Sequence, residues 1–298
     1  MNRVFSLFLA LLLLISLAGC SADPHSAQIA ATTLPVYEFT SVLCRGTDLT
    51  VTRLVTESVS CLHDYTLTVR QVKAAQAAET IVISGAGLES FLAGVIDEEK
   101  AIDASEGISL LSGEHHHDHE DSDEHEDHGE HEETQDPHIW LSPENAAQMA
   151  ENICNGLCLR YPEYASRFKD NLPGLLAQLD ALEQYGKSQL SQLSCRDIIT
   201  FHDGFSYFAQ AMDLNILAAV EEESGSEASA KDLKELILLV WEHPGCGIFV
   251  EKNGSDSAAT VIAAETGVAA NTLDMAMSGD SYFEAMYRNI DTIKEALS

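Results

Sequence analysis

Two series of alternating strand-like and helical segments constrain the fold of this 298-residue chain more than any other feature. Short apolar runs alternate with helical patterns from residue 27 to residue 111, and again from residue 194 to the end. Strands separated by helices are typical of mainly parallel sheets. Between the two series, residues 161–193 repeat leucines at helical spacing without a β-like interruption. The expected fold class is therefore α/β, with two parallel-sheet lobes joined by a long backbone helix.

The expected strands are short and apolar, and most are followed by a helical pattern. In the first lobe they lie at residues 27–34, 49–55, 80–85 and 108–111. In the second lobe they lie at residues 195–202, 214–220, 246–252 and 268–274. Helices are expected after each early strand, including one from Leu88. Another begins at Pro143, where Ser142 supplies the N-cap and proline occupies the first helical position.

The N-terminus has the layout of an export signal. Arg3 supplies a positive charge, residues 4–17 form an apolar stretch, and Leu-Ala-Gly-Cys20 follows at once. This last sequence is similar to the lipobox of bacterial lipoproteins, in which the cysteine is lipidated and becomes the first residue of the mature chain. The apolar stretch is shorter than the roughly 20 residues that span a bilayer. We therefore expect an exported protein, anchored through Cys20 at the outer face of the bacterial cytoplasmic membrane.

These patterns divide the chain into consecutive parts. Residues 1–19 are expected to be the signal peptide, 20–26 a tether, 27–160 the N-terminal lobe, 161–193 the linking helix and 194–298 the C-terminal lobe.

A histidine-rich loop interrupts the first lobe at residues 114–133. Its twenty positions hold seven histidines and eleven acidic residues, and neither lysine nor arginine. Such a segment cannot offset the entropy of ordering a packed core. Imidazoles and carboxylates bind divalent metals such as Zn²⁺, whereas an acidic run without histidines is usually a solvated linker. The auxiliary metal ligands predicted in this loop are His115, His116, His117, His119, His125, His128 and His131.

The net charge of −32 also limits the partners of the protein. A nucleic-acid backbone would be repelled, so we expect no nucleic-acid partner. The same charge attracts cations over a long range at low salt.

With Cys20 assigned to the anchor, six of the seven cysteines remain. An even number in an exported chain is compatible with disulfides, although six cysteines allow 15 connectivities. Cys195 and Cys246 each open a β-like run and are a candidate pair on neighbouring strands. Cys44 with Cys61 is a second candidate pair.

Four residues are candidates for an ordered metal site. His202 and Asp274 each end a strand of the second lobe, and ligands in open α/β sheets lie beyond the carboxyl ends of strands. His63 follows the second strand of the first lobe, and His138 precedes the helix at Pro143. Three imidazoles and one carboxylate would make a tetrahedral set suited to Zn²⁺ in the cleft between the lobes. By position alone, a hydrogen-bonded loop histidine is the commoner interpretation.

Several motifs add a family resemblance that covers nearly the whole mature chain. Residues 136–143, DPHIWLSP, resemble the DPHxWLSP motif of cluster A-I solute-binding proteins, which are metal-binding lipoproteins of ABC importers. His63-Asp-Tyr65 resembles the HDYxLxPxDVK stretch of the zinc (ZnuA-like) branch, and residues 201–208 resemble its HxAFxYF stretch. A histidine-rich loop just before DPHxW is also a trait of that branch.

The resemblance implies that His63, His138 and His202 bind the metal, with Asp274 as the fourth ligand. Asp280 is a weaker candidate for the fourth position, because the family's Asp-Pro-Leu reads Asp274-Met-Ala here. The implied function is extracytoplasmic capture of Zn²⁺, the transported ligand, for an ABC permease and its ATPase. A monomer without enzymatic activity is expected.

Three alternatives stay open at this point. A manganese or iron importer subunit is less expected, since manganese relatives carry glutamate where this chain has His202, and imidazoles suit Zn²⁺ better. A zinc hydrolase would also use three histidines, but no HExxH motif is present. A zinc buffer or adhesin not coupled to a permease is the third.

Overall fold

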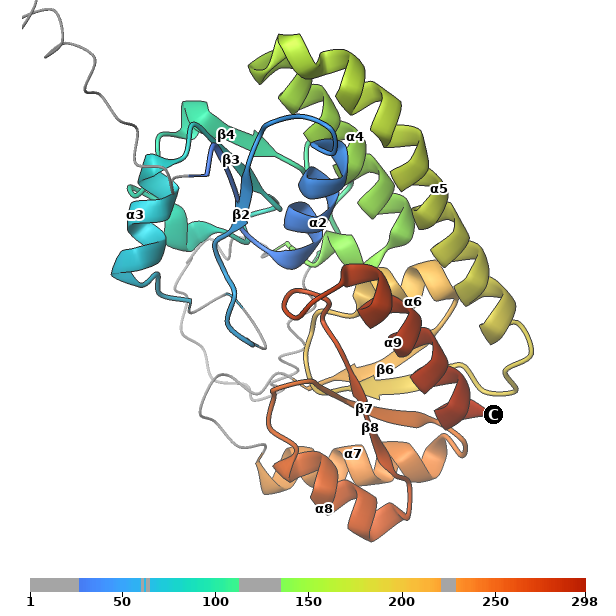
Figure 1. Cartoon of the computed structure of the whole chain (residues 1–298). Coiled ribbons are helices and arrows are strands. Elements are labelled where there is room, and N and C mark those ends of the chain that lie inside the picture. Colours follow the sequence, from blue (N-terminus) through green and yellow to red (C-terminus); the bar gives the residue numbers. More distant parts are fainter. Residues whose placement is uncertain (1–26, 60–61, 63–64, 113–134, 221–228) are drawn as a thin grey trace, which may run out of the picture.

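The computed structural model describes residues 27–59, 62, 65–112, 135–220 and 229–298, and it divides them into two α/β lobes (Figure 1). Each lobe contains a four-stranded parallel sheet, with the strand orders β2-β1-β3-β4 and β6-β5-β7-β8. The strands of the first sheet are β1 (Ile29–Ala31), β2 (Val51–Arg53), β3 (Thr80–Ile83) and β4 (Ala101–Asp103). Those of the second are β5 (Asp197–Thr200), β6 (Asn215–Ala219), β7 (Gly247–Glu251) and β8 (Ala270–Leu273). The predicted fold class is confirmed.

Helices cover both faces of the first sheet. Helix α3 (Val69–Ala77) begins at a capping box formed by Thr68 and Gln71, and its Ala75 packs in a small cluster with Ile81 of β3. Helices α2 (Leu34–Leu43) and α4 (Pro143–Arg160) belong to the main core cluster on the other face. The N-cap predicted for α4 is present, because Ser142 Oγ accepts the backbone N–H of Asn145 at 3.3 Å.

The second sheet is covered in the same way. Helices α7 (Ala230–Glu242) and α8 (Ser257–Thr266) pack against one face and form a separate cluster with Ile199 and Ile248. Helices α6 (Ser206–Met212) and α9 (Tyr282–Leu297) lie on the face toward the first lobe (Figure 1), and their buried side chains join the main cluster. One hydrophobic core therefore extends through both lobes.

The long connecting helix predicted from the leucine repeat is present as α5 (Ala165–Leu190). It follows a short 3-10 turn at Pro162–Tyr164 and runs along one side of both lobes (Figure 1). Buried leucines such as Leu175 and Leu182 form its inner face. It contacts α2 and α4 of the first lobe and α6 and α9 of the second. The domain boundaries predicted around it stay predictions.

Two expectations for the first lobe are wrong. The run 108–111 is not a strand. The fourth strand is β4, and 108–111 instead leads to the lobe interface, where Leu111 N donates to Tyr207 Oη at 2.9 Å. The helix expected from Leu88 is only a 3-10 turn at Ser90–Leu92. The turn cannot continue as a helix, because the backbone is non-helical at Ala93, with ψ of 126°, and left-handed at Gly94, with φ of 71°.

Two further 3-10 turns lie at Glu98–Lys100 and Ile139–Leu141. In the part of the chain that the structure describes, no helix combines the length and the apolar character needed to cross a bilayer.

Candidate metal centre

His138 is held by the carboxylate two residues before it. Asp136 Oδ1 accepts the His138 backbone N–H at 2.9 Å and lies 2.7 Å from ring Nδ1. Both side chains are buried, and His138 is fully inaccessible to solvent. A carboxylate can only accept, so Nδ1 carries the proton and Nε2 presents its lone pair. This carboxylate–histidine arrangement is the one that orients metal-binding imidazoles.

His202 brings a second imidazole to the same point from the other lobe. It lies two residues beyond the end of β5, and its Nε2 is 3.3 Å from His138 Nε2. The two rings are nearly perpendicular, at 86°. Two nitrogens bound to one tetrahedral Zn²⁺ at about 2.0–2.1 Å would lie about 3.4 Å apart. The two Nε2 atoms are therefore already at the spacing of neighbouring ligands.

Glu251 lies beside the candidate centre at a position that the sequence did not indicate. It ends β7, and its Oε2 lies 3.8 Å from His202 Nδ1, with 9% of its side chain exposed. The carboxylate faces the ring nitrogen that points away from His138, as Asp136 does for the other imidazole. The available signal was its place at the carboxyl end of a buried strand beside the strand of His202.

Asp274 lies beyond the end of β8, as predicted, but its carboxylate has other partners. Oδ2 is 2.8 Å from Lys252 Nζ, and Oδ1 accepts the backbone N–H of Ala276 at 2.9 Å. Asp280 is exposed.

Of the predicted ligand set, the structure brings together His138 and His202. His63 lies outside the described residues, as do Cys20 and the seven histidines of residues 114–133. Within the described ranges, no group of three or more histidine, cysteine, aspartate or glutamate side chains is gathered closely enough to hold a metal. The pair of imidazoles is therefore the nucleus of the candidate centre.

Comparison with known proteins identifies the family. The model of the family described as zinc-uptake complex component A, periplasmic (ZnuA), matches residues 29–296. The chain belongs to the ZnuA family. Among curated proteins, 98% of the chain aligns at 29% identity with a zinc-binding lipoprotein, AdcA, of Streptococcus pneumoniae. The chain spans 61% of the length of that relative. A putative metal-binding protein of Treponema pallidum is 29% identical over 79% of the chain and 77% of its own length.

Solved structures of the family have the same fold. A crystal structure of ZnuA superposes with a TM-score of 0.75 at 26% identity, covering 91% of this chain and all of that one. The Zn(II)-bound ZnuA-like domain of Streptococcus pneumoniae AdcA superposes with a TM-score of 0.73 at 26% identity. That match covers 91% of this chain and 99% of the domain. The relatives named as lipoproteins and the family described as periplasmic are consistent with export.

Tyr207 is a second residue that the sequence did not single out. Its hydroxyl donates to the carbonyl oxygen of Asp136 at 3.0 Å and accepts the N–H of Leu111 at 2.9 Å. Tyr207 belongs to α6, which follows His202 in the chain. One buried hydroxyl thus connects the second lobe to the backbone on both sides of the histidine-rich loop, at Leu111 and at Asp136. Beside it is a cavity of about 640 Å³ that Lys187 of α5 also lines.

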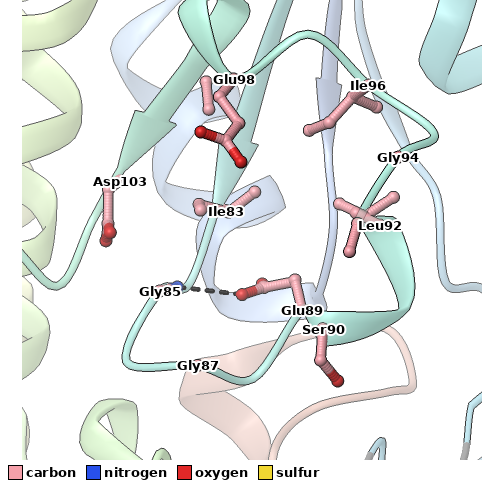
Figure 2. Close-up of a pocket in the computed structure, with 12 residues that line it drawn as sticks. Ile83, Gly85, Gly87, Glu89, Ser90, Leu92, Gly94, Ile96, Glu98 and Asp103 are labelled. Atoms are coloured by element: carbon pink, nitrogen blue, oxygen red, sulfur yellow. Dashed lines mark hydrogen bonds between the residues drawn. The ribbon is translucent and has the colours of Figure 1, made fainter.

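A cavity of about 520 Å³ in the first lobe is chemically different from the imidazole pair. Apolar side chains such as Ile83 and Leu92 line it, together with Glu89 (Figure 2). Burial raises the pKa of Glu89 to about 7, although three hydrogen bonds oppose the shift. They come from Thr32 Oγ1 and from the N–H groups of Ser84 and Gly85. This carboxyl holds the 84–89 loop and is already satisfied by protein donors.

His243 has the hydrogen-bonded position expected of an ordinary turn histidine. It caps the C-terminus of α7, and its Nδ1 lies 3.0 Å from Asp197 Oδ2 at the start of β5. Hydrogen bonds from Asn215 and then His243 lower the pKa of Asp197. This pair is at the opposite end of β5 from His202, so it provides a control for the candidate centre.

The described members of the candidate disulfide pairs, Cys44, Cys195 and Cys246, are free thiols in the structure. Cys195 and Cys246 lie at neighbouring strand starts, and burial followed by the nearby Cys195 raises the pKa of Cys246. The partner predicted for Cys44 is Cys61, which lies outside the described residues. Both pairings stay predictions.

Replacing Asp136 with asparagine is expected to lower metal affinity by about 10–100-fold, the usual cost of removing a hydrogen-bonded carboxylate behind a ligating histidine. The amide is neutral and holds the imidazole orientation less strongly. Calorimetric titration with Zn²⁺ measures the change. The matched control is Asp197→Asn, which weakens the comparable contact to His243 and should leave affinity unchanged. Equal affinities in both variants would contradict the role assigned to Asp136.

Proposed function

We propose that this protein captures Zn²⁺ outside the cytoplasm and delivers it to an ABC import permease and its ATPase. The observation that carries the proposal is the 3.3 Å approach of His138 Nε2 to His202 Nε2, from opposite sides of the lobe interface. Membership of the ZnuA family and the similarity to Zn(II)-bound relatives support zinc as the cargo.

The proposed ligand set is His63, His138, His202 and Asp274. Neutral imidazoles favour Zn²⁺ over Mn²⁺, which prefers harder oxygen ligands and six-coordinate geometry. With three neutral histidines and one carboxylate, the occupied site has a charge of about +1, and carboxylates around the histidines, such as Asp136 and Glu251, offset it.

We propose that the histidine-rich loop collects zinc weakly at several exchangeable positions and raises its concentration near the cleft. The high-affinity site does not need the loop. The mature chain is held at the outer face of the cytoplasmic membrane through lipidated Cys20 and acts as a monomer.

The deciding experiment is a titration of the metal-free protein lacking residues 114–133. We expect one tight Zn²⁺ site with little response to Mn²⁺, and about a 100-fold loss of zinc affinity in the same protein carrying His202→Ala, on the order of one ligand's share of a four-ligand site. Stronger binding of Mn²⁺, or an unchanged affinity in the variant, would overturn the assignment. Loss of the tight site on deletion of residues 114–133 would contradict the proposal that the high-affinity site does not need the histidine-rich loop.

A further inference from the structure

The carboxylate proposed as the fourth ligand already holds a cation of the protein. Asp274 Oδ2 forms an ion pair of 2.8 Å with Lys252 Nζ, and Arg288 Nη1 lies 3.9 Å from the same oxygen. Oδ1 accepts the N–H of Ala276. Both oxygens are therefore engaged. The Asp274 side chain is 9% exposed, so its negative charge is poorly solvated and depends on these partners.

The fold places Lys252 there through the register of two parallel strands. Glu251 of β7 pairs with Leu273 of β8, and Lys252 N donates to Leu273 O at 2.7 Å. The residues that follow this pair, Lys252 and Asp274, therefore lie side by side. Glu251, the residue before Lys252, faces His202. Lys252 is therefore adjacent in sequence to a residue that borders the candidate centre.

The backbone at Asp274 is clamped independently of its carboxylate. Asn289 of α9 accepts the Asp274 N–H at 2.8 Å and donates to its carbonyl oxygen at 2.7 Å. Asn289 is buried, so both bonds are protected from water. Lys252 is different, because 43% of its side chain is exposed and its ammonium can move into solvent. Exchange of partners at the carboxylate requires only a rotation of the lysine side chain.

We propose that Lys252 is a built-in competitor of the transported metal, which occupies Asp274 in the metal-free protein and leaves when the cation arrives. This inference rests on the proposed function, since it takes Asp274 as the fourth ligand. An ammonium and Zn²⁺ on the same carboxylate oxygen would repel each other at short range, so the lysine leaves as the metal binds. Breaking the ion pair therefore subtracts from the binding free energy and speeds release. A protein that must deliver its cargo benefits from both effects.

The test compares Lys252→Met with wild-type protein by Zn²⁺ calorimetry and by the rate at which a chromophoric chelator removes bound zinc. We expect about threefold to tenfold tighter binding, the range set by loss of a partly exposed charged hydrogen bond, with a slower transfer to the chelator. The direction of the change in zinc affinity is informative, because removal of a contact that only supports the structure would weaken zinc binding. Lys252→Gln is a second neutral variant.

Two controls separate competition from general electrostatics. Lys231→Met removes the same charge from α7, where Lys231 is 69% exposed and pairs with Glu235, and should leave zinc affinity unchanged. Lys252→Arg keeps a cation at the site and should retain the wild-type affinity. Denaturant unfolding of the zinc-free variants reports whether the ion pair also contributes to stability.

The outcomes distinguish this inference from the function on which it rests. Unchanged or weaker binding in Lys252→Met, while His202→Ala still loses zinc, would overturn the competitor and leave zinc capture intact. An equal gain in Lys231→Met would also overturn it, because the effect would then be one of net charge. If His202→Ala retains full affinity, the proposed site itself fails.

Discussion

Replacing His138 with alanine is expected to weaken Zn²⁺ binding by about 100-fold or more. Four-ligand zinc sites bind with about 10–16 kcal/mol, so one ligand contributes on the order of 3 kcal/mol, or about two orders of magnitude in Kd. The loss should be at least as large as for His202, because His138 is fully buried and its Nδ1 is held by Asp136 at 2.7 Å. Titration of the metal-free protein measures the effect.

The control for this experiment is His243→Ala. His243 also has its Nδ1 near an aspartate, at 3.0 Å, but lies at the other end of β5 and should not affect zinc affinity. The alanine at 138 leaves the Asp136 carboxylate buried without the ring N–H, which costs about 1–3 kcal/mol of stability. His138→Gln refills part of the space and should show the same loss of zinc. Retention of tight binding in both 138 variants would contradict the assignment.

Replacing Trp140 with alanine is expected to reduce the free energy of unfolding by about 3–5 kcal/mol, the range for truncating a buried tryptophan. Its ring is fully buried, and its Nε1–H donates to Met275 O at 2.7 Å. Its own carbonyl oxygen accepts the Tyr282 hydroxyl at 2.8 Å. Because Met275 belongs to the second lobe, loss of the indole should loosen the lobe interface, although alanine keeps the backbone carbonyl that Tyr282 contacts. Urea unfolding followed by circular dichroism measures the change.

The chain supplies its own control, because it has only two tryptophans. Trp241 on α7 is 59% exposed, and Trp241→Ala should change stability by about 0.5 kcal/mol or less. Trp140→Phe keeps most of the ring but leaves Met275 O without its donor, at a cost of about 1–3 kcal/mol. A loss below about 1 kcal/mol in Trp140→Ala would show that the interface does not depend on this side chain.

Patterns of neighbouring residues predicted where individual side chains lie along strands and helices, but not which distant segments meet. The apolar run before His202 predicts that it follows the end of a strand, and it lies two residues beyond β5. The place of Ser142 before proline predicts an N-cap, and its hydroxyl accepts the N–H of Asn145. The run 108–111 shows the limit, because a short, mainly apolar run can form a strand or, as here, half-buried irregular backbone at the lobe interface.

Contacts between distant segments could not be predicted in this way. Glu251 is adjacent to His202 only because β7 pairs with β5, and Lys252 reaches Asp274 only through the register of β7 with β8. A residue-type pattern contains no information about which of several acidic side chains meets which cation. The engaged state of Asp274 therefore became visible only in three dimensions.

The sequence by itself determined the α/β class and the two lobes around one long helix, and it predicted the histidines most suited to a metal. These follow from periodicity and side-chain chemistry, which are properties of short segments. Only the tertiary structure decided that His138 and His202, 64 positions apart, meet at 3.3 Å, and that Lys252 rather than a histidine faces Asp274. Those distances depend on how the two lobes pack against α5 and against each other, and packing is a property of the whole core.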